Sequence, residues 1–451
     1  MAEIGLTMIL LIGTVCAAFS APTTLNPGPH LLLDDYLIES SARITRKVNP
    51  PRRDPANPVV TGPEDKCFQP YVTVLRDPQT RRFRIWYGVP ESASQSHLAY
   101  MESKDGIHWI RPHQVLQDPG RIQFGACVLD EGPKFPDPEK RFKFAYWDDG
   151  GLQIATSPDG LCWKLLADGP VLPHNHDINN IFRDPIRSRY TANVSVYVSG
   201  SGWTGQRRVT MQSTSSDLIH WTEPRYIITP DEKDEGETQF YCMGGILARG
   251  DLLVGMVRVL RDDLPADPGG PVAGIGYTTL TWSRDGIHWQ RDREPFLNRG
   301  RAGAWDHAMS WVDCQLPVGD EVFLYYGGYA RGHKVERFTE RQIGLARMLR
   351  DRYAAREAGA VPGSLRTPLV TLDAKAMTLN ADAVGGQIRV QIADPAGKPV
   401  PGYSFADCAP ISADSVAVPV KWKRPLSGLK GRPIRLEFRL QRAKLFAFDL
   451  R

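Results

Sequence analysis

The chain has 451 residues, of which 42% are hydrophobic, with 55 Lys and Arg against 51 Asp and Glu. This length accommodates two or three domains. Because the charges nearly cancel, the composition argues against a nucleic-acid surface or an acidic partner.

The first twenty residues have the pattern of a secretory signal peptide. Residues 5–20 are apolar and end in small residues, with Ala18 and Ser20 placed as signal peptidase requires. Cleavage after Ser20 predicts a secreted or periplasmic protein, and no later apolar run has the length of a membrane span. The next apolar segment, residues 30–40, is a predicted strand that we expect to complete the last sheet and close the fold.

A short phrase, Ser-x-Asp-Gly-x-x-Trp, recurs along the chain. Its copies begin at Ser103, Ser157, Ser215 and Ser283, and the third has Leu218 in place of the glycine. Asp-Gly favours a turn because glycine accepts positive φ and the aspartate binds nearby backbone amides. The tryptophan then packs beside a chain reversal. The regular return of this phrase indicates repeated structural units.

Each unit is predicted to contain four strands in up-and-down order. In three units an Asp-Pro turn precedes an aromatic and β-branched run, and its aspartates are Asp77, Asp137 and Asp184. Residues 304–349 have the same strand rhythm without the recurring turn, which gives a fifth unit. The fold class predicted is therefore all-β, with a five-bladed β-propeller over residues 30–350.

The sequence changes character after residue 350. Residues 351–364 are first charged and then rich in Gly and Pro, which we interpret as a linker. Residues 365–451 contain four alternating runs separated by turns, which predicts a C-terminal β-sandwich. No catalytic cluster occurs there, so we expect a structural or ancillary recognition module.

The cysteines indicate neither a disulfide framework nor a metal site. The six that follow residue 20 are scattered, and several lie within apolar strand runs. We interpret them as buried free thiols. Since no zinc-ligand spacing occurs, no metal and no cofactor are predicted.

The recurring phrase carries a family resemblance. The copies at Ser103, Ser215 and Ser283, each with histidine before the tryptophan, resemble the blade phrases of the five-bladed propeller glycoside hydrolases, families 32 and 43 and their relatives. The resemblance covers about residues 30–350, and the sandwich is also similar to that of family 32. It implies an enzyme that cleaves a glycosidic bond in a poly- or oligosaccharide, and the signal-peptide pattern predicts that this enzyme is secreted. The family 32 phrase Asn-Asp-Pro-Asn is replaced here by Gln69-Pro70, which removes one expected acid.

Three predicted innermost strands begin with an acidic residue: Asp177, Glu237 and Asp306. In a propeller, the innermost strands converge on a central channel. Glycoside hydrolysis needs one carboxyl group that protonates the leaving oxygen and a second that activates water or attacks the anomeric carbon. We therefore predict these three residues as catalytic, with carboxyl oxygens converging within about 10 Å.

Six further residues are predicted to bind substrate. Two aromatic rings offer stacking surfaces, His307 neighbours an acid, Arg258 offers a clamp for an acidic sugar, and Asp35 offers a carboxylate at the channel mouth. The full set is Asp35, Gln69, Tyr241, Arg258, Trp305 and His307.

Two other functions stay open from sequence alone. A non-catalytic carbohydrate-binding propeller would account for the missing acid, and a phosphorylase would require a basic phosphate pocket. In each case the expected partner is a carbohydrate, with neither nucleic acid nor membrane involved.

Overall fold

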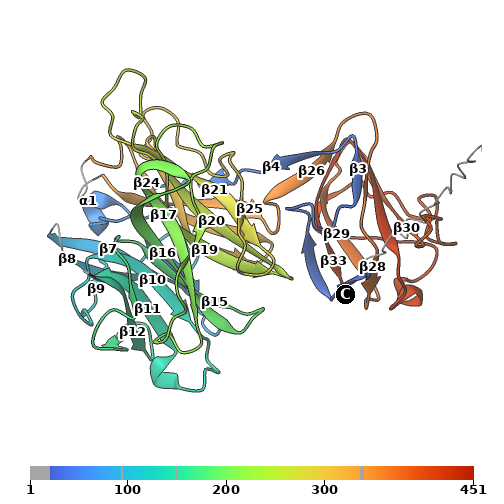
Figure 1. The fold of residues 1–451 in the computed structure, drawn as a ribbon. Coiled ribbons are helices and arrows are strands. Elements are labelled where there is room, and N and C mark those ends of the chain that lie inside the picture. Colours follow the sequence, from blue (N-terminus) through green and yellow to red (C-terminus); the bar gives the residue numbers. More distant parts are fainter. Residues whose placement is uncertain (1–20, 93–94, 149, 336–339) are drawn as a thin grey trace, which may run out of the picture.

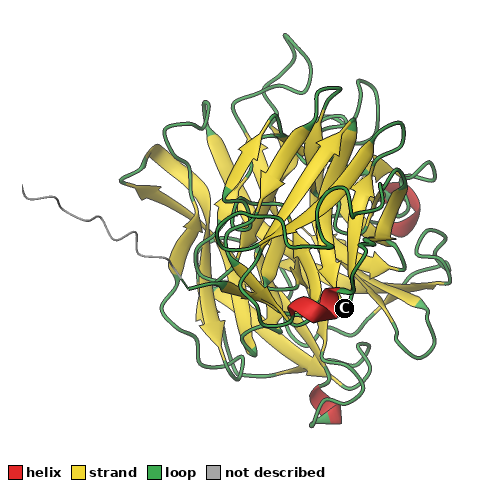
Figure 2. Ribbon diagram, turned by 90° about the vertical axis from the view of Figure 1, so that its right-hand side faces the viewer, coloured by secondary structure: helices red, strands yellow, loops and turns green. Residues whose placement is uncertain are grey.

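A computed structural model describes residues 21–92, 95–148, 150–335 and 340–451, so the predicted signal peptide at 1–20 lies outside the described residues. The described chain is almost entirely strand and turn, which confirms the all-β prediction. Its only helical elements are α1 (Gly62–Asp65) and two 3-10 turns, η1 (Pro138–Lys140) and η2 (Leu426–Leu429). None of the described helices is long and apolar enough to cross a membrane. The strands form two lobes joined at a narrow waist (Figure 1), and Figure 2 shows that loops connect nearly all of them.

The larger lobe begins with three antiparallel meanders. The first consists of β6 (Val72–Arg76), β7 (Phe83–Ser92), β8 (Gln95–Ser103) and β9 (Gln114–Val115). The second consists of β10 (Phe124–Asp130), β11 (Phe142–Asp148), β12 (Gly151–Ser157) and β13 (Lys164–Leu165), with β14 (Leu172–Pro173) also paired to β12. The third consists of β15 (Asn179–Asp184), β16 (Arg189–Gly200), β17 (Trp203–Ser215) and β18 (Arg225–Ile228).

An eight-stranded sheet contains two more meanders. One consists of β19 (Thr238–Arg249), β20 (Leu252–Arg261), β21 (Ile275–Ser283) and β22 (Gln290–Arg291). The other consists of β23 (Met309–Val318), β24 (Glu321–Tyr329), β25 (Gln342–Leu349) and β5 (Arg52–Arg53). The two join through one parallel pairing of β21 with β23, at Gly276 and Met309. The three strands predicted within residues 304–349 are thus present, as β23, β24 and β25.

The first strands of the meanders contact one another in a closed cycle. In the described chain β6 contacts β10, β10 contacts β15, β15 contacts β19, β19 contacts β23, and β23 contacts β6. Strands more than two hundred residues apart in sequence therefore lie side by side. The ends of these strands are where side chains from distant segments can meet.

The recurring phrase forms the predicted turns. In the first copy, Asp105 Oδ1 accepts hydrogen bonds from the backbone N–H groups of Ile107 and His108, both at 2.8 Å, and Gly106 has φ of 78°. The Gly106 carbonyl accepts a bond from the Tyr325 hydroxyl at 2.8 Å, and Trp86 Nε1 bonds the equivalent Gly160 carbonyl at 2.8 Å. The turn of the first meander is thereby bonded to the fifth meander, and the turn of the second meander is bonded to the first.

The Asp-Pro aspartates also behave as turn residues. Asp77 Oδ1 accepts from the backbone N–H of Gln79 at 2.9 Å, and Asp184 Oδ1 accepts from that of Ile186 at 3.0 Å. These bonds fix the reversal before the second strand of the first and third meanders, whereas the Asp137 side chain makes no capping bond before η1 in the second.

The closing strand differs from the prediction. Residues 30–40 were expected to complete the last sheet, but β2 (Gly28–Leu31) pairs with β33 (Ala443–Leu450) in the smaller lobe. The last meander is completed by β5, in which Arg52 and Arg53 pair with Arg347 and Ala346. The strand prediction holds for only three residues of this range, His30 and Leu31 in β2 and Ser40 in β3 (Ser40–Ala42), while residues 32–39 mostly form turns and bends. Which edge a short strand pairs with depends on the unpaired edges and apolar faces that the folded chain offers.

The smaller lobe combines N-terminal and C-terminal segments in two larger sheets and a short pair. One sheet contains β31 (Asp414–Pro419), β29 (Met377–Asp382), β33, β26 (Ala354–Ala358) and β4 (Thr45–Val48), with β2 on β33. The other contains β3 (Ser40–Ala42), β27 (Gly363–Arg366), β32 (Arg435–Gln441) and β30 (Gln387–Ala393). The short pair is β1 (Thr23–Leu25) with β28 (Val370–Leu372).

Residues 351–364, expected as a linker, contain β26 and the start of β27. Both strands have partners on each side, so this segment is an integral part of the smaller lobe. Its charged residues misled the prediction because Arg352 and Arg356 are themselves buried, beside the small buried residues Ala354, Ala355 and Ala358.

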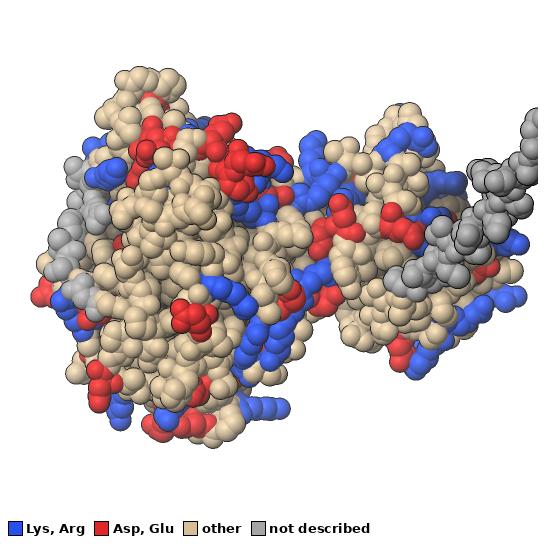
Figure 3. Space-filling model, viewed as in Figure 1, with Lys and Arg blue, Asp and Glu red and all other residues tan. Residues whose placement is uncertain are grey.

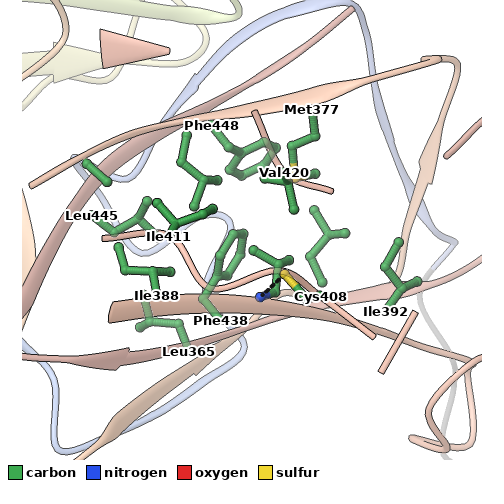
Figure 4. Packing of buried hydrophobic residues seen from close by; sticks show 14 of the residues in the cluster. Leu365, Met377, Ile388, Ile392, Cys408, Ile411, Val420, Phe438, Leu445 and Phe448 are labelled. Carbon is green, nitrogen blue, oxygen red and sulfur yellow. Dashed lines mark hydrogen bonds between the residues drawn. The ribbon is translucent and has the colours of Figure 1, made fainter. Parts of the chain in front are cut away.

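Apolar side chains from both larger sheets of the smaller lobe share one core (Figure 4). Leu379 and Phe448 from one sheet pack in the same cluster as Ile388 and Phe438 from the other. Cys408 lies in this core, and its sulfur accepts a hydrogen bond from the Val390 N–H at 3.3 Å.

All six described cysteines are free, as interpreted from the sequence, and all but Cys162 are buried. Burial raises the pKa of four of these thiols to about 12, so they remain protonated and behave as small apolar groups; the four are Cys67, Cys127, Cys242 and Cys314.

Candidate functional site

A pocket lies where the first strands of the larger lobe begin. We call it the central pocket, and its lining comes from four of these strand beginnings and from the loop between β24 and β25. The lining residues are Phe68, Gln69, Pro70, Tyr71, Phe124, Asp177, Tyr241, His333 and Arg341. Segments that span more than 270 residues of sequence therefore face one small cavity.

A second hollow, which we call the rim pocket, is formed by neighbouring residues of the third, fourth and fifth meanders. It has a volume of about 530 Å³, within the range of about 300–1,000 Å³ that small ligands occupy. Its lining residues are Tyr197, Gln206, Arg207, Arg208, Glu237, Gln239, Asp262 and Lys334. The lining is almost wholly polar, which suits a ligand rich in hydroxyl groups.

A chain of polar contacts links the two pockets. Asp177 Oδ1 lies 3.0 Å from His176 Nδ1, and Arg208 Nε donates to His176 Nε2 at 3.0 Å. Arg208 Nη1 also donates to Asp262 Oδ2 at 3.4 Å, and His333 Nδ1 lies 3.3 Å from Asp262 Oδ1. Because a guanidinium can only donate, His176 Nε2 is the acceptor in its contact with Arg208.

Electrostatics keep both carboxyl groups of this chain ionised. Burial by itself would raise the pKa of Asp177, but the attraction of His176, Arg208 and His333 outweighs it and lowers that pKa below 3.8. Burial is likewise outweighed at Asp262, where His333, Arg208 and Lys334 lower the pKa. At neutral pH, both groups are therefore carboxylates that accept protons or stabilise positive charge.

Tyr241 packs at the centre of the site. Trp311 stacks on its ring at 4.9 Å, and the rings of His176 and His333 approach its edge or face at 5.0 and 5.4 Å. Arg208 lies over the same ring at 4.9 Å. Protein groups thus occupy much of this predicted stacking surface, and Tyr241 chiefly orders the side chains around Asp177.

Gln69 lines the central pocket with its amide hydrogen-bonded to protein groups, and Arg258 lies behind the pocket. Gln69 donates to Ser96 and to the Gln123 carbonyl and accepts from the Gly125 N–H at 2.9 Å. Arg258 is buried, pairs with Asp313 at 2.7 Å and lies over the Tyr71 ring at 5.3 Å. Burial raises the pKa of Asp313 although Arg258 and the Val72 N–H oppose it.

Five predicted site residues line neither pocket: Arg258, which lies behind the central pocket, and the four that follow. Asp306 is buried and pairs with Arg53 Nε at 2.6 Å, while Trp305 stacks on Tyr326 at 5.5 Å. His307 Nε2 lies 2.8 Å from Asp267, and the exposed Asp35 pairs with Arg356 at 2.7 Å. Among the described residues that line the two pockets, the predicted trio is represented only by Asp177 and Glu237.

The position of Asp306 follows from the closing strand. β23 starts at Met309, so Asp306 lies in the preceding loop, where Arg53 of β5 and the Tyr326 hydroxyl bind its Oδ2. No sequence pattern placed Arg53 in this sheet, because residues 30–40 were expected there. A buried carboxylate with a guanidinium partner is a structural ion pair.

Four residues that line the two pockets were not predicted from the sequence: Arg208, Asp262, His333 and Arg341. The prediction considered the residues that begin the first strand of each meander, and none of these four does so. One signal was available for Asp262, because in an antiparallel pair the end of the second strand lies beside the start of the first. Thr238 pairs with Arg261, so Asp262 necessarily neighbours Glu237.

No protein-family model and no curated protein matches the chain. Solved structures that resemble it include a β-1,2-mannobiose phosphorylase from Listeria innocua, with 13% identity and a TM-score of 0.47 over 66% of this chain and 96% of the other. A glycosyl hydrolase from Bacteroides ovatus has 14% identity and a TM-score of 0.45, over 68% and 95%. An N-acetylgalactosamine deacetylase from F. plautii has 17% identity and a TM-score of 0.44, over 68% and 95%. The likeness is distant, so the activity of this chain has to follow from its own side chains.

Proposed function

We propose that the protein is a secreted glycoside hydrolase with a five-bladed β-propeller and a C-terminal β-sandwich. The closed cycle of contacts from β6 through β10, β15, β19 and β23 supports the propeller, because a ring of blades leaves each first strand between two others. The two sheets around one core support the sandwich. The apolar segment at residues 5–20 supports export.

The position of Asp177 is the observation that carries this proposal. It is an ionised carboxylate where the strand beginnings of different blades meet, in a cavity of about 20 Å³ that has room for one water. Because its pKa is lowered, Asp177 suits the role of base or nucleophile. It cannot serve efficiently as the proton donor, because a carboxyl group with a lowered pKa holds no proton at neutral pH.

The proton donor then has to come from another carboxyl group of the site. Asp262 is excluded by its own lowered pKa. Glu237 lines the rim pocket, is exposed, and forms no ion pair within the described part of the chain. We assign it the role of general acid, with Asp262 and Arg208 holding the hydroxyl groups of the bound sugar.

A product screen against plant and algal polysaccharides tests the proposal. Wild-type protein is expected to release a sugar, and Asp177→Asn and Glu237→Gln should each lower kcat/KM by at least about a hundredfold, the usual effect of losing an acid or base. Binding to the same polysaccharide should persist in both variants.

Glu232→Gln is the matched control, because Glu232 is an exposed glutamate in the same loop as Glu237 but does not line the pocket. Its activity should equal that of the wild type. Full activity in Asp177→Asn would contradict the proposal. Polysaccharide binding without turnover in the wild type would instead assign the protein to the non-catalytic carbohydrate-binding class.

A second candidate function, phosphorolysis, is favoured by the basic side chains of the rim pocket. Arg207, Arg208 and Lys334 line it together, and such a cluster suits an inorganic phosphate that would replace water as the attacking group. Release of a sugar phosphate that requires added phosphate would select this function over hydrolysis.

A further inference from the structure

A groove runs along the waist between the two lobes, away from both pockets of the candidate site. Its lining is Leu33, Asp34, Asp35, Tyr36 and Arg46 from the N-terminal segment of the smaller lobe, and Trp282, Ser283, Arg284, Asp285, His288, Gln290 and Asp292 from the fourth meander. We call it the interlobe groove. Its volume is about 650 Å³, within the range of ligand sites.

Two forked ion pairs cross this groove from one lobe to the other. Arg284 binds both carboxylate oxygens of Asp34, each at 2.8 Å, and Arg46 binds those of Asp292 at 2.9 and 2.8 Å. Bidentate pairs of this kind are directional and fix the distance between their backbones. The groove walls are therefore held in one geometry before any ligand arrives, which lowers the entropy cost of binding.

Carboxylates outnumber guanidinium groups in the groove lining, although each carboxylate has a basic neighbour. Besides the two forked pairs, Asp35 pairs with Arg356 at 2.7 Å, and Asp285 lies 2.6 Å from the His288 ring. Figure 3 shows acidic and basic side chains close together along the waist. Such a lining repels an anionic ligand and suits a neutral one that makes hydrogen bonds, because paired carboxylates and guanidinium groups still have lone pairs and N–H groups to offer.

Two aromatic side chains, Tyr36 and Trp282, also line the groove. Tyr36 is 49% exposed, and Arg284 lies over its ring at 4.2 Å. The Trp282 ring contributes to the same lining, and its Nε1 donates to Gln290 Oε1 at 3.1 Å, which orients the Gln290 amide. Leu33, which is buried, is the only aliphatic side chain in the lining, so the groove offers little to the apolar side chains of a peptide.

We propose that the interlobe groove is a second carbohydrate-binding site, which holds a neutral oligosaccharide segment of the polymer on which the candidate active site acts. This inference rests on the proposed function for the class of ligand. The combination of an aromatic ring, preorganised carboxylate–guanidinium pairs and an oriented amide matches the alternating C–H faces and hydroxyl groups of a sugar chain. Such a site would retain a long substrate between cleavage events.

Binding to soluble neutral polysaccharides tests the groove without interference from turnover. The probes are β-glucan, mannan, xylan and galactan, and the starting protein is the full chain with Asp177→Asn. Affinity electrophoresis should show retardation by at least one polymer. Adding Tyr36→Ala should weaken that binding about fivefold to tenfold, the loss expected for one aromatic contact, and Gln290→Ala should weaken it less.

Tyr226→Ala is the matched control, since Tyr226 is 52% exposed on the larger lobe and lies outside the groove. It should bind as the starting protein does, and Tyr36→Ala in the wild-type background should leave turnover of a short oligosaccharide unchanged. Equal binding by the Tyr36→Ala protein and its parent, or no binding by the parent, would overturn the groove proposal. Turnover by the wild type decides the proposed function separately, so the two can fail independently.

Discussion

At the scale of single residues, the location of a charged group decides its chemistry more than its type. Asp177 and Asp306 both precede first strands, and both are surrounded by basic or polar groups. Asp177 lines a pocket, whereas the carboxylate of Asp306 is enclosed by Arg53, Ser310 and Tyr326. A carboxylate becomes a reactive group only when part of its surroundings is left for the substrate.

The network around Asp177 makes a prediction about pH. Because the pKa of Asp177 is lowered, its carboxylate should persist below pH 3.8 and the acid limb of kcat/KM should lie in that region. Arg208→Met removes one of the attractions that oppose burial, so the pKa should rise and the acid limb should move to higher pH. A pH profile of kcat/KM for both proteins measures this. An acid limb that stays in place, with only a uniform loss of rate, would show that Arg208 does not hold Asp177 in its ionised state.

At the scale of elements, the recurring turn is a connector between meanders. Two features of the turn favour glycine: the backbone has a positive φ, and a neighbouring ring occupies the space that a side chain would need. A Cβ on Gly106 would lie 2.6 Å from the Tyr325 hydroxyl oxygen and 2.9 Å from a Phe83 ring carbon. Leu218, in the incomplete copy, also has positive φ, at 69°, but its buried side chain packs in a hydrophobic cluster that offsets the strain.

Gly106→Ala should therefore lower the free energy of unfolding by about 2–4 kcal/mol, combining left-handed strain with overpacking. Gly319→Ala is the control, because Gly319 has a similar φ of 62° but open space around it. That substitution should cost only about 1–2 kcal/mol. Urea unfolding of the two variants measures the difference, and equal losses would mean that the contact with Tyr325 contributes nothing to stability.

The same turns should weaken in acid. Bonds from the His220 ring and from the Ile219 and His220 N–H groups lower the pKa of Asp217 below 3.8, even though this turn is exposed. The unfolded chain binds a proton near pH 3.8 and the folded turn does so only at lower pH. The stabilisation by these turns is therefore present above that pH and is lost as the pH falls through the lowered pKa.

At the scale of the whole molecule, the N-terminal segment belongs to both lobes. β2, β3 and β4 complete sheets of the smaller lobe, and β5, only four residues after β4, completes the last meander of the larger lobe. The forked pairs of Arg46 and Arg284 add side-chain contacts across the same waist. The two lobes are thus coupled through one continuous stretch of chain.

This coupling predicts that residues 351–451 do not fold alone. Without residues 26–48 the fragment loses three strands, and apolar groups such as Leu32 and Leu37 leave its core. Circular dichroism and two-dimensional NMR of the fragment should show an unfolded chain. Joining residues 26–48 to it through a flexible linker should restore cooperative unfolding. A fragment 351–451 that is folded without the N-terminal strands would contradict this account of the lobe.

The sequence by itself determined the local structure: the turns at Asp-Gly and Asp-Pro, the strands between them, and the acidic residues at strand starts. These follow from backbone preferences and from alternation along a few neighbouring residues, which is information that the chain carries locally. Only the tertiary structure decided which strands close the larger lobe, that Arg53 binds Asp306, and that Arg208, Asp262 and His333 surround Asp177. Those outcomes depend on pairing between segments far apart in sequence, where several partners satisfy the same pattern and the burial of the complete core selects one.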